Sequence, residues 1–475
     1  MSLEAPAFTA PSLTIGGEAA PTTASFDVIN PATGRPFLTA PDASLAQLDL
    51  AVEAAAAAFG PWRRSDDETR QVALRRAADV LVAAADEIAP LLTAEQGKPL
   101  TRSHYEVHGS AAWLRYYADL ELPREVVQDD ETGLAEVVRR PFGPVAAIAP
   151  WNFPLTLAAA KIGPALRAGN TVVLKPSPYT PLTSLRIGEL LRGVFPPGVL
   201  NVLSGGDELG AAMTSHPLIR KIAFTGSTAT GKKIVAAAAA DLKHLTLELG
   251  GNDPAIVLDD ADVEFAARRI FATAFNNSGQ ACVAPKRVYA HQSVLPHLVD
   301  ALAELARAAK VGDGMQPGTE LGPLNNRAQF ERVAGLVTDA VAHGATVVTG
   351  GRAMSGPGYF YEPTILTDVD DRLEIVAEEQ FGPALPVMGF RDIDEAIERA
   401  NATQYGLGAS VWGADSERAA TVAVQLDAGM AWINTHTAIA AHLPFPGIKW
   451  SAVGIEGGPW GLESYSEMRL IYQAR

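Results

Sequence analysis

The sequence "GPVAAIAP" at residues 143–150, followed by "NTVVLKPS" at residues 170–177, decides the fold. Three further runs of the same kind follow at residues 199–206, 221–227 and 245–251, and helical segments separate them. The runs are apolar without interruption, which is typical of strands that are buried on both faces. We therefore expect a parallel α/β sheet that is covered by helices on both sides.

A second series of apolar runs begins with "KRVYAHQ" at residues 286–292 and ends with "GMAWINT" at residues 429–435. Helical segments such as "DIDEAIERANA", residues 392–402, lie between these runs. The chain has 475 residues, which is too long for one hydrophobic core, because domains usually hold roughly 100–200 residues. The sequence therefore predicts two α/β domains.

Two amphipathic helices are expected before the first sheet. The first is "SLAQLDLAVEAAAAAF", with Ser44 as its N-cap, and Gly60-Pro61 is expected to end it. The second is expected to begin at Ser65, where Glu68 would complete a capping box, and to run through residue 92.

Two further segments fit neither sheet. Residues 124–140 alternate on both sides of the turn sequence Asp-Asp-Glu-Thr-Gly and are typical of a protruding hairpin, and residues 463–475 are typical of a lone strand. Exposed strand edges are normally covered in proteins, so these segments predict a partner chain.

Composition excludes several classes of function. Acidic residues number 54 against 38 Lys plus Arg, a formal net charge of −16, which would repel nucleic acid. No stretch approaches the ~20 consecutive apolar residues of a membrane span, and the opening "MSLEAPAFTAPSLTIGGE" has no export-signal pattern. A single cysteine forms no intramolecular disulfide, which favours a reducing compartment, and we expect the cytoplasm.

Three residues are candidates for chemistry. The only cysteine, Cys282, lies in the stretch "NNSGQACVAP", which is too polar and glycine-rich for a core thiol. A free cysteine is most often a buried small hydrophobe, and a nucleophile is the alternative interpretation. Glu248 ends the run "LTLE" before two glycines, where burial could raise its pKa to that of a general base, or it is an ordinary strand-end residue. Asn152 follows the first strand and could donate to an oxyanion or satisfy its own turn.

Two further features suggest a phosphate-bearing ligand. In "KIAFTGSTATGKKI" a strand leads through Gly226 and Ser227 into a helix whose free N–H groups could bind a pyrophosphate. Lys175 ends another strand, where its ammonium could meet a ribose or a phosphate. A structural turn and a solvated lysine are the alternative readings of these two features.

Taken in order, these motifs, together with "EEQFGP" at residues 378–383 and "PFPGIKWS" at residues 444–451, resemble the NAD(P)-dependent aldehyde dehydrogenase family over essentially the whole chain. The opening "IGGE" and "FDVINPATG" stretches are also similar to that family. The resemblance implies a Rossmann-like cofactor domain at residues 1–122 and 142–249 and a catalytic domain at residues 250–445. Residues 123–141 and 460–475 would form a small β oligomerisation element of a homodimer or homotetramer.

The resemblance also implies a role for each matching residue. Cys282 would be the nucleophile, Glu248 the general base and Asn152 an oxyanion donor, while Lys161 and Glu456 would help to move protons around Glu248. Binding of NAD, with NADP as the alternative, would use the residues Trp151, Lys175, Gly226, Ser227, Glu379 and Phe381. The substrate tunnel would be lined by Phe153, Leu157, Ala281, Val283, Ile439 and Phe445. No metal is expected.

The implied reaction follows from these groups. A thiol with an ordinary pKa of ~8.5 is only slightly ionised at neutral pH, so Cys282 would need a base or a favourable field. Its attack on an aldehyde would give a thiohemiacetal, hydride transfer would leave a thioester, and water activated by Glu248 would release a carboxylic acid.

Several positions depart from the family pattern. Pro178 stands where a Glu that disfavours NADP is common, so NAD is our first expectation and NADP stays open. Pro446, Ala452 and Ile455 differ near the substrate entrance. Ala160 replaces the Arg that many semialdehyde members carry and offers no aromatic cage, which favours a medium-chain or aromatic apolar aldehyde.

Two other functions compete with hydrolytic oxidation. A CoA-acylating dehydrogenase would release the thioester with a thiol, but such enzymes generally lack a base at the position of Glu248. A catalytically silent binding or structural protein on the same scaffold is disfavoured because Cys282, Glu248 and Asn152 are all present.

Overall fold

An eight-stranded sheet forms one half of the protein, in a computed structural model that describes residues 8–475. Residues 1–7, which begin the stretch without an export-signal pattern, lie outside the described residues. The sheet order is β2-β1-β9-β8-β7-β10-β11-β20. Its five central strands are parallel and comprise β7 (Pro144–Ile148), β8 (Thr171–Lys175), β9 (Leu200–Val202), β10 (Lys221–Thr225) and β11 (His244–Glu248).

The order of these five strands defines a ligand-binding edge. Numbered along the chain from β7, they follow the order 3-2-1-4-5 of a Rossmann-like sheet. The order reverses between β7 and β10, and ligands of such sheets bind outside the carboxyl ends of the strands at that point. The predicted parallel sheet is confirmed, with antiparallel strands β1 (Leu13–Ile15) and β20 (Ala452–Val453) added on either side. The outermost strand is β2 (Glu18–Ala20).

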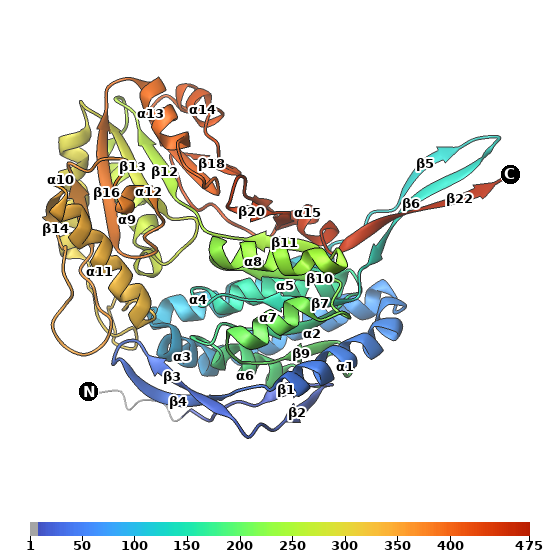
Figure 1. Ribbon diagram of the computed structural model, residues 1–475. Coiled ribbons are helices and arrows are strands. Elements are labelled where there is room, and N and C mark those ends of the chain that lie inside the picture. The colour runs from blue at the N-terminus through green and yellow to red at the C-terminus, as the bar shows by residue number, and fades with distance from the viewer. Residues whose placement is uncertain (1–7) are drawn as a thin grey trace.

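Helices cover both faces of this sheet (Figure 1), and the side chains of its central strands are therefore buried on both sides. The helices are α1 (Leu45–Arg63), α2 (Asp67–Ala83), α3 (Ala85–Gln96), α4 (Leu100–Asp119), α5 (Pro154–Arg167), α6 (Leu182–Leu190), α7 (Asp207–Ser215) and α8 (Thr228–Ala238).

The expected ends of the first two helices need correction. Ser44 caps α1 as expected, but the helix does not stop at Gly60-Pro61. Trp62 is buried in the last turn and donates through Nε1 to Leu166 O at 3.2 Å, which holds that turn in place. The hydroxyl of Ser65 donates to Trp62 O, so the predicted capping box is wrong.

Asp66 is the N-cap of α2, and its carboxylate accepts from the Thr69 N–H at 2.7 Å. The expected single helix through residue 92 is in fact two, α2 and α3, which join at Ala84.

A seven-stranded sheet of order β14-β15-β16-β13-β12-β17-β18 forms the second half and confirms the second α/β domain. All strands are parallel except β14. They are β12 (Asp253–Val257), β13 (Pro285–His291), β14 (Thr346–Thr349), β15 (Thr364–Thr367), β16 (Ala384–Phe390), β17 (Gly408–Trp412) and β18 (Met430–Ile433). The helices are α9 (Val263–Ala274), α10 (Leu295–Ala308), α11 (Arg327–Ala342), α12 (Glu374–Ala377), α13 (Ile393–Asn401) and α14 (Ser416–Ala423).

The predicted hairpin and the C-terminal strand form one arm that projects from the body (Figure 1). The hairpin is β5 (Glu125–Asp129) and β6 (Gly133–Pro141), and β22 (Ser466–Ala474) pairs antiparallel with β6 along its whole length. The expectation of a lone strand is therefore wrong: β6 takes up one edge of β22, and the outer edges of the arm belong to β5 and β22.

Shorter elements complete the structure. The pair β3 (Ser25–Asn30) and β4 (Arg35–Pro41) lies outside both large sheets, as does the pair β19 (Phe445–Pro446) and β21 (Ile455–Glu456). The helix α15 (Gly458–Glu463) leads into the arm. Among residues 8–475, no helix has the length and apolar character needed to cross a membrane.

Candidate active site

Four segments with candidate residues meet at one edge of the first sheet, because the carboxyl ends of its parallel strands lie together there. β7 leads into Asn152, β8 ends at Lys175, β10 leads into Gly226 and β11 ends at Glu248. The Gly226 N–H donates to Glu248 O at 3.0 Å, which joins the last two segments.

The loop that carries Cys282 has an unusual backbone. Asn277, Ser278 and Gly279 all have positive φ, at 51°, 55° and 76°. Such φ values cost free energy in residues other than glycine and persist only where the surroundings enforce them. Here Ser278 Oγ donates to Gly322 O at 2.7 Å, and side chains of the loop bond back to its own backbone.

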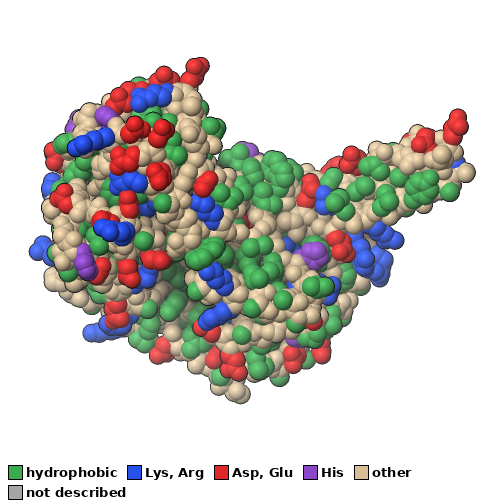
Figure 2. Space-filling model, turned by 45° about the horizontal axis from the view of Figure 1, so that its top comes forward, with side chains coloured by type: hydrophobic (Ala, Val, Ile, Leu, Met, Phe, Trp, Pro, Cys, Tyr) green, Lys and Arg blue, Asp and Glu red, His purple; other side chains and the backbone are tan. Residues whose placement is uncertain are grey.

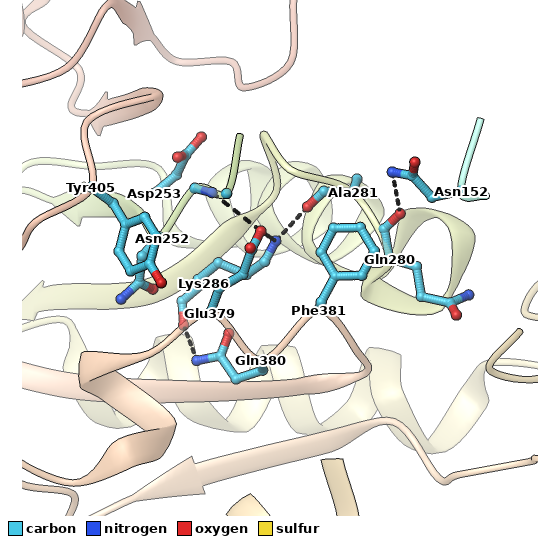
Figure 3. Close-up of polar contacts among 12 residues, drawn as sticks. Asn152, Asn252, Asp253, Gln280, Ala281, Lys286, Glu379, Gln380, Phe381 and Tyr405 are labelled. Carbon is cyan, nitrogen blue, oxygen red and sulfur yellow. Dashed lines mark hydrogen bonds and ion pairs between the residues drawn. The ribbon is translucent and has the colours of Figure 1, made fainter. Parts of the chain in front are cut away.

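Asn152 is buried and touches this loop directly. Its Nδ2 donates to Gln280 O at 3.0 Å, two residues before Cys282 (Figure 3). An amide nitrogen has two N–H groups, so one donor remains besides this bond. The backbone carbonyl of Asn152 accepts from Asn277 Nδ2 at 3.0 Å and from Lys98 Nζ at 2.8 Å. Asn152 therefore fixes the Cys282 loop and retains one N–H for a ligand.

A buried ion pair supports Asn152 from behind. Lys98 Nζ pairs with Glu106, and both side chains are almost wholly inaccessible. The other oxygen of Glu106 accepts from the Leu155 N–H at 2.9 Å and from the Thr156 N–H at 3.3 Å, at the start of α5. A carboxylate at a helix N-terminus satisfies N–H groups that have no partner within the helix. The pair therefore holds both ends of the turn between Asn152 and α5.

Glu248 is a buried carboxyl group without a hydrogen-bond partner. It is 2% exposed, and neither carboxylate oxygen has a partner among the described residues. Burial, followed by the charge of Glu456, raises the pKa of Glu248 well above its usual range, and Lys161 opposes this shift. A carboxyl with a raised pKa is suited to accept a proton near neutral pH.

Lys161 and Glu456 form an ion pair beside Glu248. Lys161 Nζ lies 2.8 Å from Glu456 Oε1 and donates to Thr225 Oγ1 at 2.6 Å. Both charged side chains are buried. The structure thus joins residues from α5, β10 and β21 in one polar cluster that the sequence separates by nearly 300 positions.

The two glycines after Glu248 allow the two halves of the protein to meet at Cys282. A Cβ on Gly251 would overlap the Cys282 carbonyl oxygen, so only glycine fits there. The Gly251 N–H also donates to Glu379 Oε1 at 3.2 Å. One short segment therefore connects Glu248, Cys282 and Glu379.

The charges around Cys282 disfavour its thiolate form. Although Cys282 retains some exposed surface, burial, followed by the negative charges of Glu379, Glu248 and Asp253, raises the pKa of its thiol to about 12. Lys286 opposes this shift. A base or a bound ligand is needed before this thiol can act as a nucleophile.

Glu379 and Phe381 both lie near Lys286, and Phe381 contacts Trp151. The Trp151 and Phe381 rings pack edge to face with centroids 5.2 Å apart. Lys286 Nζ lies 3.7 Å from Glu379 Oε1 and donates to Ala281 O (Figure 3). Burial raises the pKa of Glu379 to about 7, against the opposing effect of Lys286.

Lys175 and Ser227 lie farther along the same sheet edge. Lys175 is 4% exposed, and its only described hydrogen bond is a long one, 3.4 Å, to Pro176 O. Burial lowers its pKa to about 8, while Asp207 and Asp42 raise it. Ser227 caps α8 by accepting from the Thr230 N–H at 3.2 Å. The start of this 11-residue helix and the poorly satisfied ammonium are each suited to a phosphate or a ribose.

The residues expected in a substrate tunnel come from three segments. Phe153 and Leu157 are at the start of α5, and Ala281 and Val283 flank Cys282. Phe445 pairs with Glu456 in the small β19–β21 sheet, which attaches its loop to the Glu248 cluster. Ile439 is 42% exposed, and no described contact joins it to Cys282.

Sequence reasoning missed several residues that the structure places around the site. They are Lys98, Glu106, Lys221, Gln280 and Lys286. One signal was available: Lys286 is a charged residue near the start of a strand that is otherwise expected to be buried. Lys98 and Glu106 pair with each other, but the Asn152 carbonyl and the Leu155 N–H that they hold lie about 50 residues away, and no local pattern indicates those contacts.

Comparisons with known proteins agree with this geometry. The aldehyde dehydrogenase family model matches residues 19–471. Phenylacetaldehyde dehydrogenase of Pseudomonas fluorescens is 41% identical over 465 residues, covering 94% of this chain and 92% of that protein. The probable succinate-semialdehyde dehydrogenase (NADP+) of Sinorhizobium fredii is 39% identical over 453 residues, covering 94% and 92%. The NAD+ complex of an aldehyde dehydrogenase from Bacillus cereus superposes with a TM-score of 0.96 at 38% identity, covering 98% and 97%.

Proposed function

The chain belongs to the aldehyde dehydrogenase family, whose members oxidise aldehydes with NAD(P), and on this premise we propose that Cys282, Glu248 and Asn152 carry out a hydrolytic oxidation. The observation that carries the proposal is the buried, unpartnered carboxyl of Glu248 in the same cluster as the only thiol of the chain. The product would be a carboxylic acid.

The residues present fit a dinucleotide. Lys175, with its poorly satisfied ammonium, and the N-terminus of α8 at Gly226 and Ser227 would hold the adenosine ribose and the pyrophosphate. Glu379 would hold the nicotinamide ribose, with Phe381 and Trp151 beside the ring. Bound NAD(P) supplies the acceptor for the hydride that leaves the substrate.

In the first half of the reaction, Cys282 attacks the aldehyde carbon. The thiol must lose its proton, and Glu248 is a buried base that lies close enough for its charge to affect the pKa of Cys282. The free N–H of Asn152 and the backbone N–H of Cys282 would then stabilise the oxyanion of the thiohemiacetal. Because Asn152 is already held by Gln280, Asn277 and Lys98, it is preorganised for this task.

In the second half, Glu248 accepts a proton from the water that attacks the thioester. Its raised pKa suits this step, and Lys161 with Glu456 would take the proton onward through the buried pair. Because the raised pKa values of both Glu248 and Cys282 disfavour their charged forms, turnover should rise with pH from neutral to mildly alkaline conditions.

The substrate would be a medium-chain or aromatic apolar aldehyde. The tunnel residues Phe153, Leu157, Val283 and Phe445 would select by apolar burial, at about 25 cal/mol per Å². Many semialdehyde members of the family have an Arg at the position of Ala160. Because Ala160 provides no cation to bind a second carboxylate, a dicarboxylic semialdehyde is disfavoured. The similar phenylacetaldehyde dehydrogenase supports an aromatic substrate, whereas the similar succinate-semialdehyde dehydrogenase does not.

NAD is the cofactor we favour, and the chain is proposed to assemble as a homodimer or homotetramer through its arm. Residues 1–122 and 142–249 would serve as the cofactor domain and residues 250–445 as the catalytic domain.

The test combines an aldehyde panel with two variants. Wild type should reduce NAD or NADP in the presence of an aldehyde, and Cys282→Ala should lose this activity while it keeps its fold and its cofactor affinity. Glu248→Gln retains size but not basicity, so rapid mixing at elevated pH should release at most one equivalent of reduced cofactor and then stall. A mass increase on the Cys282 peptide would identify the trapped thioester.

The same experiment separates the competing functions. Restoration of Glu248→Gln turnover by CoA, or a need for CoA in wild type, would indicate the acylating alternative. The absence of aldehyde-dependent reduction of either cofactor across the panel would indicate the catalytically silent alternative.

A further inference from the structure

Lys286 is a buried cation that the proposed reaction does not use. It is the second residue of β13, four positions after Cys282, and it is 2% exposed. An ammonium in such a place is costly unless its N–H groups are satisfied and a negative charge lies close by. Its contacts therefore indicate what it does.

Four contacts connect Lys286 with the two sides of the site. Its Nζ donates to Ala281 O, the carbonyl directly before Cys282, and lies 3.7 Å from Glu379 Oε1 (Figure 3). The ammonium also lies 5.4 Å from the centre of the Phe381 ring. Its backbone carbonyl accepts from Gln380 Nε2 at 3.2 Å. One side chain thus bridges the Cys282 loop and the segment 379–381.

We propose that Lys286 is a positioning residue that fixes the Cys282 loop relative to Glu379 and counters the negative charge of Glu379 at the thiol. The inference rests on the proposed function in so far as Cys282 is the nucleophile and Glu379 contacts the cofactor. It adds a residue that links the reactivity of the thiol to the state of the cofactor carboxylate.

Electrostatics support the geometry. The charged groups that face the Cys282 thiol are Glu379, Lys286, Glu248 and Asp253, and Lys286 is the only cation among them. Burial and the three carboxylates raise the pKa of Cys282, and Lys286 alone opposes them. Without Lys286, Glu379 would keep only the Gly251 N–H as a described side-chain partner, and its charge at the thiol would be uncompensated.

The lone cysteine makes a direct test possible, because iodoacetamide can alkylate only one site. We would measure the alkylation rate from pH 6 to 10 in wild type, Lys286→Met and Lys286→Arg, without substrate or cofactor. Because the pKa of the Cys282 thiol, about 12, lies above this pH range, the alkylation rate should rise with pH in every variant. Lys286→Met should alkylate about tenfold more slowly than wild type throughout the range, since a rise of one unit in pKa lowers the thiolate population tenfold. Lys286→Arg should recover most of the rate. Lys310→Met, which removes an exposed lysine, should behave as wild type.

A second variant with the opposite expected effect allows the proposal to be tested even if Lys286→Met does not fold. Glu379→Gln removes the charge that Lys286 opposes, so it should alkylate faster than wild type above neutral pH. In steady state, Lys286→Met should also raise the KM for the cofactor, because Glu379 is no longer held. Equal alkylation profiles in wild type, a folded Lys286→Met and Glu379→Gln would overturn the inference.

Failure of this inference is distinguishable from failure of the proposed function. The alkylation measurements need no turnover, so they report on Lys286 even if wild type oxidises no aldehyde. Conversely, normal aldehyde oxidation with unchanged alkylation in the Lys286 variants would overturn the role of Lys286 and leave the proposed function intact.

Discussion

Asn152 commits one side-chain N–H to Gln280 and has a second that could meet an oxyanion. Removal of the Asn152 side chain should therefore have two separable effects. Loss of an oxyanion donor slows the chemical step, whereas loss of the Gln280 bond loosens the Cys282 loop, whose positive φ values need support.

For Asn152→Ala we expect acylation to fall by roughly 10²–10³, the usual effect of one lost oxyanion donor. Single-turnover reduction of the cofactor measures this step, and the affinity for NAD should barely change. Asn277→Gly is the matched control, because glycine tolerates the positive φ at this position and the change removes loop bonds to the Asn152 and Gln280 backbone carbonyls without removing an oxyanion donor, so it should have a smaller effect. A variant that binds NAD poorly but reacts normally when saturated would identify Asn152 as a structural turn residue.

The cofactor preference depends on a position where the chain departs from its family. Pro178 has no carboxylate to repel a 2′-phosphate, so we expect NAD to be favoured over NADP by less than about 100-fold, or ~2.7 kcal/mol. Pro178→Glu should increase the preference for NAD, as measured by the ratio of kcat/KM values. Strong selectivity in wild type that this change leaves unaltered would direct attention to Asp207 and Asp42, whose charges reach Lys175.

At this scale, sequence reasoning identified the residues that sit in short, distinctive motifs. Asn152 follows a strand, Glu248 ends one before two glycines and Cys282 follows Gly279-Gln280, and the structure brings their segments together. Lys98 and Lys286 could not be assigned in the same way. Their importance lies in partners from other segments, and even the place of Lys286 near the start of a strand expected to be buried does not show which groups its ammonium contacts.

Helices α5 and α6 illustrate the same limit for whole elements. Neither helix has a capping side chain of its own, yet both are capped by buried carboxylates from preceding helices. Glu106 of α4 accepts from the first N–H groups of α5, and Glu95 of α3 accepts from Leu182 N at 2.8 Å at the start of α6. The sequence indicates these helices through their apolar faces, but their caps depend on tertiary packing.

The errors at the first two helices have the opposite cause. Pro61 and Ser65 are strong local signals, and a tertiary contact of Trp62 outweighs them. A helix end predicted from Gly-Pro or from a capping box therefore holds only where no buried side chain extends the last turn.

The Lys98–Glu106 pair leads to a prediction at the scale of the element. Breaking a buried pair leaves one charge unpaired and typically costs about 3–5 kcal/mol. Glu106→Gln should therefore lower the thermal unfolding midpoint and also slow acylation, because the turn between Asn152 and α5 loses its charged support. The double variant Lys98→Met with Glu106→Gln leaves no unpaired charge, so calorimetry should place its midpoint between those of Glu106→Gln and wild type. A double variant less stable than Glu106→Gln would contradict this account.

At the scale of the whole molecule, the sequence predicted two α/β domains and two additional β segments, which the family resemblance grouped into one element, but it did not predict the register in which those segments pair. β22 follows α15, which begins two residues after Glu456, so the arm is rooted beside the Glu248 cluster. Tyr465, at that root, is fully buried, and Lys221 Nζ lies 4.8 Å from the centre of its ring. Pairing between segments more than 300 residues apart depends on where the body of the protein places their ends, which local patterns do not contain.

The arm exposes apolar side chains that a monomer would leave in water. Val126, Met468, Leu470 and Tyr472 are each more than half exposed, at 54%, 70%, 62% and 51%, and Figure 2 shows apolar side chains along the arm. Soluble monomers seldom expose apolar side chains grouped on a projecting element. The outer edges of β5 and β22 also have no strand beside them among residues 8–475. A second copy of this chain is the partner that these observations favour.

For the arm we therefore predict that Leu470→Asp reduces the size of the assembly. Placing a carboxylate in an apolar contact removes the gain from burial, about 1.5–3 kcal/mol for a leucine, and adds the cost of desolvating a charge. Light scattering after size exclusion should give a multiple of the monomer mass for wild type and a smaller mass for Leu470→Asp at equal concentration. Gln473→Asp, which adds the same charge at an exposed polar site of β22, should retain the wild-type mass. A monomeric wild type at micromolar concentration, or an unchanged mass in Leu470→Asp, would mean that the arm does not mediate assembly.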